Sequence, residues 1–230
     1  MSTTIAISGN TPVLSADFNP PIYLDDDKEY FLGLADFESF NSIPNIESGR
    51  NKFYIDDKVI TIPEGTYDIE DIESYINKTL QDIFSEKVEF LLKPNTNTLK
   101  CHIFCNKTID FTKKDSIGKI LGFHERKIDQ FVRDESDEVV YISKVNAICI
   151  DCNICVGSFS NGKPVHIIHQ FFPAVPPGYK IVESPLPILY FPVSVKTINN
   201  ITIKVVDQYG DLINFRKETI TVRLHLKSDI

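Results

Sequence analysis

The chain has 230 residues, of which 42% are hydrophobic, so it is long enough to bury one full-sized core or two small ones. Sixteen Phe and nine Tyr against no Trp and a single Met indicate a core of aromatic and β-branched side chains, which favours sheets. The net charge is -8, with 32 acidic and 24 basic residues spread along the chain, which argues against direct nucleic-acid binding and favours protein partners.

The first segments of the chain are interpreted as strands. Residues 3–7 alternate weakly ahead of a glycine and a polar stretch, which predicts a short arm or an edge strand within residues 1–13. The nearly continuous apolar run Tyr30–Phe40 predicts a core strand that is buried on both faces. Residues 53–55 and 59–62, which flank a polar turn, predict a hairpin.

The segment that starts at Ile69 predicts the longer of two helices. Apolar residues recur there at three- and four-residue steps, and Asp68 followed by Asp71 gives an N-cap with an acid three positions on. The apolar stripe of this helix must cover part of a sheet. We expect it to lie in a connection that covers the sheet strands at residues 30–40 and at the end of the chain. The apolar stripe consists of Ile72, Ile76, Leu80 and Ile83.

The middle of the chain predicts a second hairpin, a short helix and a loop. Residues 88–92 and 99–104 give the hairpin pattern. The short helix begins at a capping Asp115 and stops at Gly122. Residues 125–138 are the most charged part of the chain, and we expect them to form an exposed loop.

The second half of the chain predicts further strands. Prolines cluster over residues 173–192, which fits extended edge or loop segments and excludes a helix. The alternating residues 201–205 and 220–226 predict strands that each bury one face. Other strand-like runs lie at residues 139–142, 147–156 and 165–172.

The pattern as a whole predicts one domain. It contains eight to ten strands, with one longer and one shorter helix in connections, and neither an internal repeat nor a domain linker. We therefore expect an all-β fold, a single antiparallel β-sandwich over residues 1–230. No window approaches 18 consecutive apolar residues, and the N-terminus lacks the pattern of a signal peptide, so we expect neither membrane insertion nor secretion.

The cysteines are the first candidates for a metal site, because together with one histidine they offer enough ligands for zinc. Residues three apart on a strand point to opposite faces of the sheet, so they cannot converge on one ion without a bulge. We therefore expect buried, reduced thiols in an intracellular compartment, with no metal and no cofactor. The residues concerned are Cys149, Cys152 and Cys155, together with Cys101, His102 and Cys105.

The histidines and acidic clusters do not form a recognisable catalytic motif. His166 and His169 lie three apart on a predicted strand and should face opposite ways. The acidic clusters at residues 25–27 and 134–138 lack the spacing of a calcium loop and are interpreted as solvated turns. Because no nucleophile elbow, phosphate loop or zinc-protease helix is present either, we predict no catalytic site and no enzyme activity. The other histidines are His102, His124 and His225.

Five stretches, taken together, carry a resemblance to a known family. They are residues 33–46, 62–72, 116–123, 152–162 and 201–226, and they span most of the chain in the family's order. In these stretches the chain resembles the penton, or minor capsid protein, of Polinton/Maverick elements and adintovirus-like viruses. The major capsid protein of such viruses has two jelly rolls and would need roughly twice this length, so the length fits the penton.

The resemblance implies a single jelly roll, two four-stranded sheets packed face to face, with residues 1–13 as an N-terminal arm. It also implies a structural protein of the virion capsid, which forms homopentamers at the five-fold vertices of an icosahedral shell and docks to the double jelly-roll major capsid protein. We expect the pentamer contacts to come from sheet edges and loops, including the proline-rich residues 173–192 with their exposed aromatic side chains.

Two other classes of function remain open at this point. The same fold would support a non-capsid β-sandwich module for protein binding or attachment. A metal-dependent nucleic-acid enzyme that uses the cysteines would require bound zinc.

Overall fold

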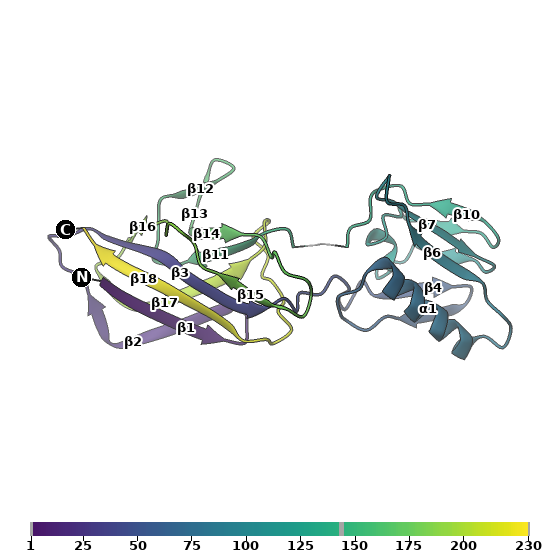
Figure 1. Ribbon diagram of the computed structural model, residues 1–230, viewed down its shortest axis with the longest axis horizontal. Helices are drawn as coiled ribbons and strands as arrows, with labels where there is room; N and C mark the ends of the chain where they lie inside the picture. The colour runs from purple at the N-terminus through teal and green to yellow at the C-terminus, as the bar shows by residue number, and fades with distance from the viewer. Residues whose placement is uncertain (1, 143–144, 230) are drawn as a thin grey trace. The chain divides into compact units, whose positions relative to one another are not determined.

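The computed structural model describes residues 2–142 and 145–229 and divides the chain into two compact units (Figure 1). Unit 1 comprises residues 1–43 and 145–230, and unit 2 comprises residues 44–144. The sequence pattern predicts one domain over residues 1–230, whereas each unit has a hydrophobic core of its own. Apolar periodicity shows that a face is buried but not against which partner, so it could not reveal this division.

Unit 1 contains two main antiparallel sheets. The first has the order β1-β18-β3-β15, with β16 also paired to β3, and the second has the order β14-β11-β17-β2. A separate hairpin, β12 and β13, connects β11 to β14. The bounds are β1 Ser2–Gly9, β2 Val13–Tyr23, β3 Tyr30–Phe40, β11 Ile148–Cys152, β12 Ser158–Ser160, β13 Lys163–Val165, β14 Ile167–Phe171, β15 Lys180–Glu183, β16 Phe191–Pro192, β17 Thr197–Val206 and β18 Ile220–Ser228.

The order of the strands in unit 1 is that of a jelly roll. Each sheet takes four of the eight main strands, and the chain passes between the sheets so that β1 pairs with β18 and β2 with β17. Such double Greek-key pairing defines the jelly-roll architecture. The predicted all-β jelly roll is therefore confirmed. The N-terminal residues form an edge strand of the first sheet.

The inward faces of the two sheets build the core of unit 1. β18 alternates buried and partly exposed residues along most of its length, as its sequence predicts. The Phe37 ring on β3 lies 5.2 Å from the Phe171 ring on β14 and 6.3 Å from the Phe215 ring, and so it bridges the two sheets. Further buried side chains come from β3, β17 and β18, namely Leu32, Leu34, Ile201, Ile203, Val205, Val222, Leu224 and Leu226.

The outer side of β3 is partly covered by the chain between β15 and β16, residues 184–190, which we call the strap. A Cβ atom at Gly33 would lie 2.5 Å from Ile188 Cγ2 and 2.5 Å from the Leu189 carbonyl oxygen, so only glycine fits beneath the strap. The Tyr190 hydroxyl lies 2.7 Å from His225 Nδ1 on β18. This cover explains why β3 is buried on both sides over part of its length. As predicted, the proline-rich segment forms strands and loops.

Unit 2 contains two small sheets and the α-helix α1. The sheets have the orders β5-β4-β8-β9 and β10-β7-β6. At its centre the Phe111 ring stacks on the Phe123 ring, with centroids 5.0 Å apart, and contacts the Phe53 ring edge to face at 6.2 Å. The bounds are β4 Lys52–Ile55, β5 Lys58–Thr61, α1 Ile69–Ile83, β6 Phe90–Pro94, β7 Cys101–Cys105, β8 Ile109–Asp110, the 3-10 turn η1 Ile117–Lys119, β9 Lys127–Ile128 and β10 Arg133–Glu135. No helix among the described residues is long and apolar enough to cross a membrane.

The helix α1 begins where the sequence predicts. Asp68 Oδ1 accepts from the Asp71 backbone N–H at 2.8 Å, and Asp71 Oδ2 accepts in return from the Asp68 N–H at 3.3 Å. Its apolar stripe packs into the core of unit 2, against β6. The expectation that this helix covers β3 and the last strands was therefore wrong, because those strands belong to the core of unit 1.

Three other expectations about unit 2 need correction. The short helix is the single turn η1, capped by Ser116, while Asp115 pairs instead with Lys52 at 2.9 Å. The charged residues 125–138 contain the strands β9 and β10, not only a loop. Residues 139–142 form no strand, because their backbone groups bond to loop carbonyls such as that of Leu99.

Candidate functional site

The five cysteines are buried free thiols that fall into two groups. Cys101 and Cys105 lie on β7 in unit 2, whereas the other three lie on and after β11 in unit 1. Strand alternation separates Cys149 from Cys152, as predicted, since only Cys152 joins the core of unit 1. The turn after β11 nevertheless returns Cys155 to Cys152, with a backbone hydrogen bond of 3.1 Å between them.

The surroundings of four of these thiols raise the pKa and so disfavour the thiolate form, whereas the hydrogen bond with Cys155 lowers the pKa of Cys152. Burial raises the pKa of Cys101 to about 12. Burial likewise raises the pKa of Cys149, and the hydrogen bond to Cys152 together with burial raises that of Cys155. Thiolates are the metal-binding and nucleophilic form of cysteine. Over residues 2–142 and 145–229, no three His, Cys, Asp or Glu side chains are grouped so that they could hold a metal ion.

We expect the purified protein to carry no stoichiometric metal, because Cys149 faces away from Cys152 and Cys155 and the two cysteine groups lie in different units. Elemental analysis of protein purified without chelators checks this expectation. One zinc ion per chain would contradict it.

Each histidine contacts a different partner, so the structure gathers no catalytic cluster from them. His166 Nδ1 lies 2.6 Å from the Cys155 carbonyl oxygen, whereas His169 Nε2 lies 2.9 Å from Glu183 Oε1. The pair His166 and His169 is thus split, as predicted. In the remaining cases, His102 lies 3.6 Å from Glu135, His124 lies 3.1 Å from Glu138, and His225 contacts Ser2 and Tyr190.

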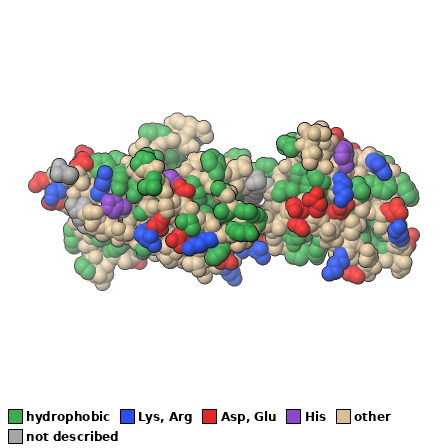
Figure 2. Space-filling view, in the orientation of Figure 1, with side chains coloured by type: hydrophobic (Ala, Val, Ile, Leu, Met, Phe, Trp, Pro, Cys, Tyr) green, Lys and Arg blue, Asp and Glu red, His purple; other side chains and the backbone are tan. Residues whose placement is uncertain are grey.

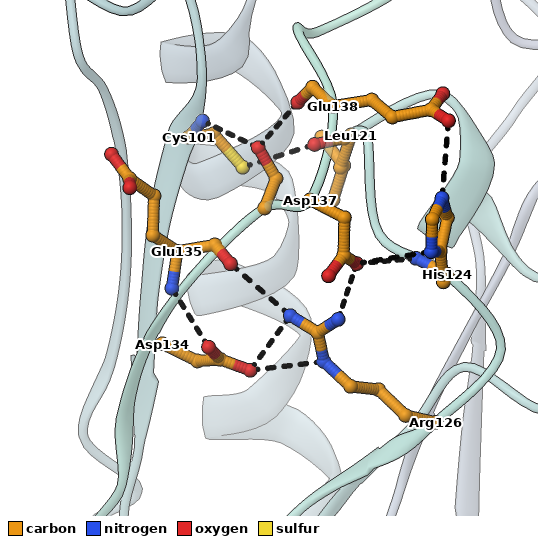
Figure 3. Close-up of polar contacts among 9 residues, drawn as sticks. Cys101, Leu121, His124, Arg126, Asp134, Glu135, Asp137 and Glu138 are labelled. Atoms are coloured by element: carbon orange, nitrogen blue, oxygen red, sulfur yellow. Dashed lines mark hydrogen bonds and ion pairs between the residues drawn. The ribbon is translucent and has the colours of Figure 1, made fainter.

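The acidic residues 134–138 are held in a polar network around Arg126 (Figure 3). Arg126 donates from Nε to Asp134 Oδ2 at 3.0 Å and from Nη2 to the Glu135 carbonyl oxygen at 3.1 Å, and it also pairs with Asp137. Its guanidinium group lies over the Phe123 ring, 5.2 Å from the centroid. The sequence pattern of this segment predicts a solvated turn and does not reveal that Arg126 organises it.

A second layer of contacts ties the same segment to β7. The Ser136 hydroxyl accepts from the Cys101 backbone N–H at 3.0 Å and donates to the Glu138 carbonyl oxygen at 2.7 Å. Asp137 Oδ2 accepts from the His124 backbone N–H at 2.8 Å. These contacts fix the segment onto the body of unit 2. Because every polar group named here is occupied within the chain, the network is best explained as structural.

Asp137→Asn should lower the free energy of unfolding at pH 7 by roughly 1–2 kcal/mol, because a charged acceptor is lost. The His124 backbone N–H lowers the pKa of Asp137 below its ordinary value of 3.8, burial opposes this, and Arg126 adds to the lowering. A carboxyl group with a lowered folded pKa stabilises the fold above its unfolded pKa, and that stability is lost as the pH falls through the folded pKa.

The difference in the free energy of unfolding between wild type and Asp137→Asn should therefore have its largest value at pH 7 and become smaller below about pH 4. Urea unfolding at a series of pH values measures it. Glu138→Gln is the matched control, since the Glu138 side chain is 71% exposed and should show little effect. A difference that is constant from pH 7 to pH 3 would contradict the assignment.

The jelly roll has two open sides where strand edges are available for contacts. On one side β1 contacts β2, and on the opposite side β14 lies beside β15, linked by the contact of His169 with Glu183. Large apolar side chains are exposed on and next to the β15 side, and hydrophobic side chains reach the visible surface of this unit in Figure 2. They include Phe172, Tyr179, Val182, Leu189 and Leu186, the last of which is 93% exposed.

Comparisons with known proteins show a likeness of fold. No family model and no curated protein matches the chain. The fold is similar to that in the crystal structure of the mavirus penton protein, with a TM-score of 0.50 and 15% sequence identity. The match covers 100% of this chain and 99% of that chain, so it includes both units. The chain therefore has a mostly β fold similar to that of a viral penton protein.

Proposed function

We propose that this protein is the penton of an icosahedral virus of the Polinton/Maverick and adintovirus type. In this role it forms homopentamers at the five-fold vertices, docks to a double jelly-roll major capsid protein and resides in the virion capsid. It is a structural protein without enzyme activity or cofactor, made in a reducing compartment of the host cell. The observation that carries the proposal is the likeness of fold to the mavirus penton protein over the full length of both chains.

The exposed surface of the jelly roll supports this role. A cyclic pentamer is built from head-to-tail contacts, in which each subunit offers two different patches. Unit 1 offers two opposite open sides, and the proline-rich segment on the β15 side exposes Tyr179, Leu186 and Leu189. Aromatic side chains such as that of Tyr179 are enriched at the centre of protein interfaces, and exposed leucines add apolar area that an interface can bury.

Light scattering tests the proposal directly. Five copies of the 26.2 kDa chain give a particle of about 131 kDa, and we expect this species at high protein concentration or in the presence of the major capsid protein. A monomer under both conditions, with no vertex density for this chain in assembled particles, would refute the penton role. It would leave the adaptor or attachment module as the better account of the fold.

A further inference from the structure

Most strand edges of this protein are protected against pairing with another chain. An exposed edge carries unpaired N–H and C=O groups, and proteins protect it by short length, charge, proline, a bulge or a covering side chain. In unit 2, Glu73 on α1 accepts from the Leu92 N–H on β6, and Tyr75 donates to the Thr61 carbonyl on β5. The Arg126 side chain donates to the Glu135 carbonyl oxygen on the edge strand β10. The remaining edge strand of unit 2, β9, is protected by its length of two residues.

Of the other edges of the jelly roll, β2 is protected as well, whereas β14 and β15 are short strands whose outer edge is still open. β2 contains Asp17, Pro20 and Pro21, and its pairing with β17 is interrupted by a register shift. β14 has five residues, and its pairing with β11 is also shifted. β15 has four residues, of which Lys180 and Glu183 are charged.

The first strand differs from all of these edges. β1 has eight residues, none of them charged and none proline, and it pairs with β18 from Ser2 to Gly9 without a shift. Among the described residues β1 pairs with β18 alone, so its other edge has no partner strand. The side chains of Ser2 and Ser8 bond to His225 and Thr221 of β18 and leave that edge uncovered. A long, regular and uncharged edge of this kind favours strand addition.

We propose that β1 is the edge by which one copy of this chain adds, strand to strand, onto the β14/β15 side of a second copy. This inference rests on the proposed pentamer and names one of its two contact patches. A contact between two β1 strands would be two-fold and could not close a five-fold ring. The β14/β15 side lies opposite β1 in the sandwich, which gives each copy the two unlike patches that a ring requires.

Charge and shape both favour a second copy as the occupant. Copies of a chain with a net charge of -8 repel one another, and the first charged residue of the sequence is Asp17, so β1 is a place where two copies can approach at little electrostatic cost. The outward side chains of β1, Thr4, Ala6 and Ser8, are small and exposed. They offer a flat surface on which the exposed Val182 and Leu186 of the neighbouring copy can pack.

Disulfide trapping in the full-length protein tests the contact. We expect the double variant Thr4→Cys/Val182→Cys, or the same design with Ala6→Cys or Ser8→Cys, to give a ladder of covalent oligomers up to the pentamer under mild oxidation. The three β1 positions lie two residues apart on one face. The position that gives the most covalent oligomer therefore shows which β1 residue lies opposite Val182 of the neighbouring copy. The native cysteines are buried, so the wild type should give no ladder.

Matched controls decide between the outcomes. Thr3→Cys/Val182→Cys should give no ladder, because neighbouring side chains on a strand face opposite ways. Covalent dimers from Thr4→Cys alone would show a two-fold β1 contact and overturn the inference. A wild-type pentamer without a ladder from any design would overturn it too, while the penton role stands. A wild-type monomer with and without the major capsid protein would instead refute the penton role.

A charge on the edge gives an independent test that needs no oxidation. Ala6→Lys should abolish the pentamer in light scattering, while the monomer still folds because Ala6 is exposed, with a small loss of stability from the like charge of Arg223 opposite it on β18. The control is Asn10→Lys, which places the same charge just beyond the strand and should leave the pentamer intact. A pentamer that persists in Ala6→Lys would contradict strand addition at β1.

Discussion

Phe37→Ala is expected to lower the free energy of unfolding by about 3–5 kcal/mol, the usual cost of removing a buried aromatic ring and leaving a cavity. The Phe37 side chain is fully buried and its ring contacts Phe171 and Phe215, so its loss opens a void between the two sheets of the jelly roll. Urea unfolding followed by circular dichroism and tyrosine fluorescence measures the change, since the chain has no tryptophan.

Phe40→Ala is the matched control on the same strand. The Phe40 side chain is 44% exposed, so the same truncation should cost about 1 kcal/mol or less there. Equal losses in the two variants would mean that Phe37 does not join the sheets.

Ile72→Asp should destabilise the protein by about 3 kcal/mol or more, because it places an unpaired charge in a dry core. Ile72 is fully buried on the stripe by which α1 packs into unit 2. Thermal unfolding gives the loss of stability, and hydrogen exchange should show that protection falls in α1, β6 and β7 while the jelly-roll strands keep theirs.

Ser74→Asp introduces the same residue on the same helix at an exposed position and should leave the melting temperature nearly unchanged. An unchanged melting temperature in Ile72→Asp as well would show that the helix does not pack.

Local patterns predicted the elements that depend on neighbouring residues. The strict alternation of β18 and the cap formed by Asp68 and Asp71 are examples, because strand burial and helix capping are set within a few residues. β2 was not predicted over most of its length; it contains Pro20 and Pro21, which an edge strand tolerates.

Features set by distant contacts were beyond such patterns. The charged residues around Arg126 were predicted to be a solvated turn. Their pairing with Arg126, through Asp134 and Asp137, depends on how β10 pairs with β7, which local sequence does not show. The division into two cores was hidden for the same reason. The open edge of β1, in contrast, could have been predicted from the sequence. No charged side chain precedes Asp17, so the first strand lacks the charges that usually protect an edge.

The pairing of β1 with β18 has a consequence for the order of folding during synthesis. Residues 44–144 are contiguous in the chain, so unit 2 has all of its strands soon after β10 leaves the ribosome. The first sheet of the jelly roll must wait for β18, which is the central partner of both β1 and β3. Until then β3 lacks its main neighbour, and the nascent chain carries two unsatisfied strands, β1 and β3, ahead of a finished unit. Premature termination before Ile220 would therefore leave a folded unit 2 attached to an incomplete, aggregation-prone jelly roll.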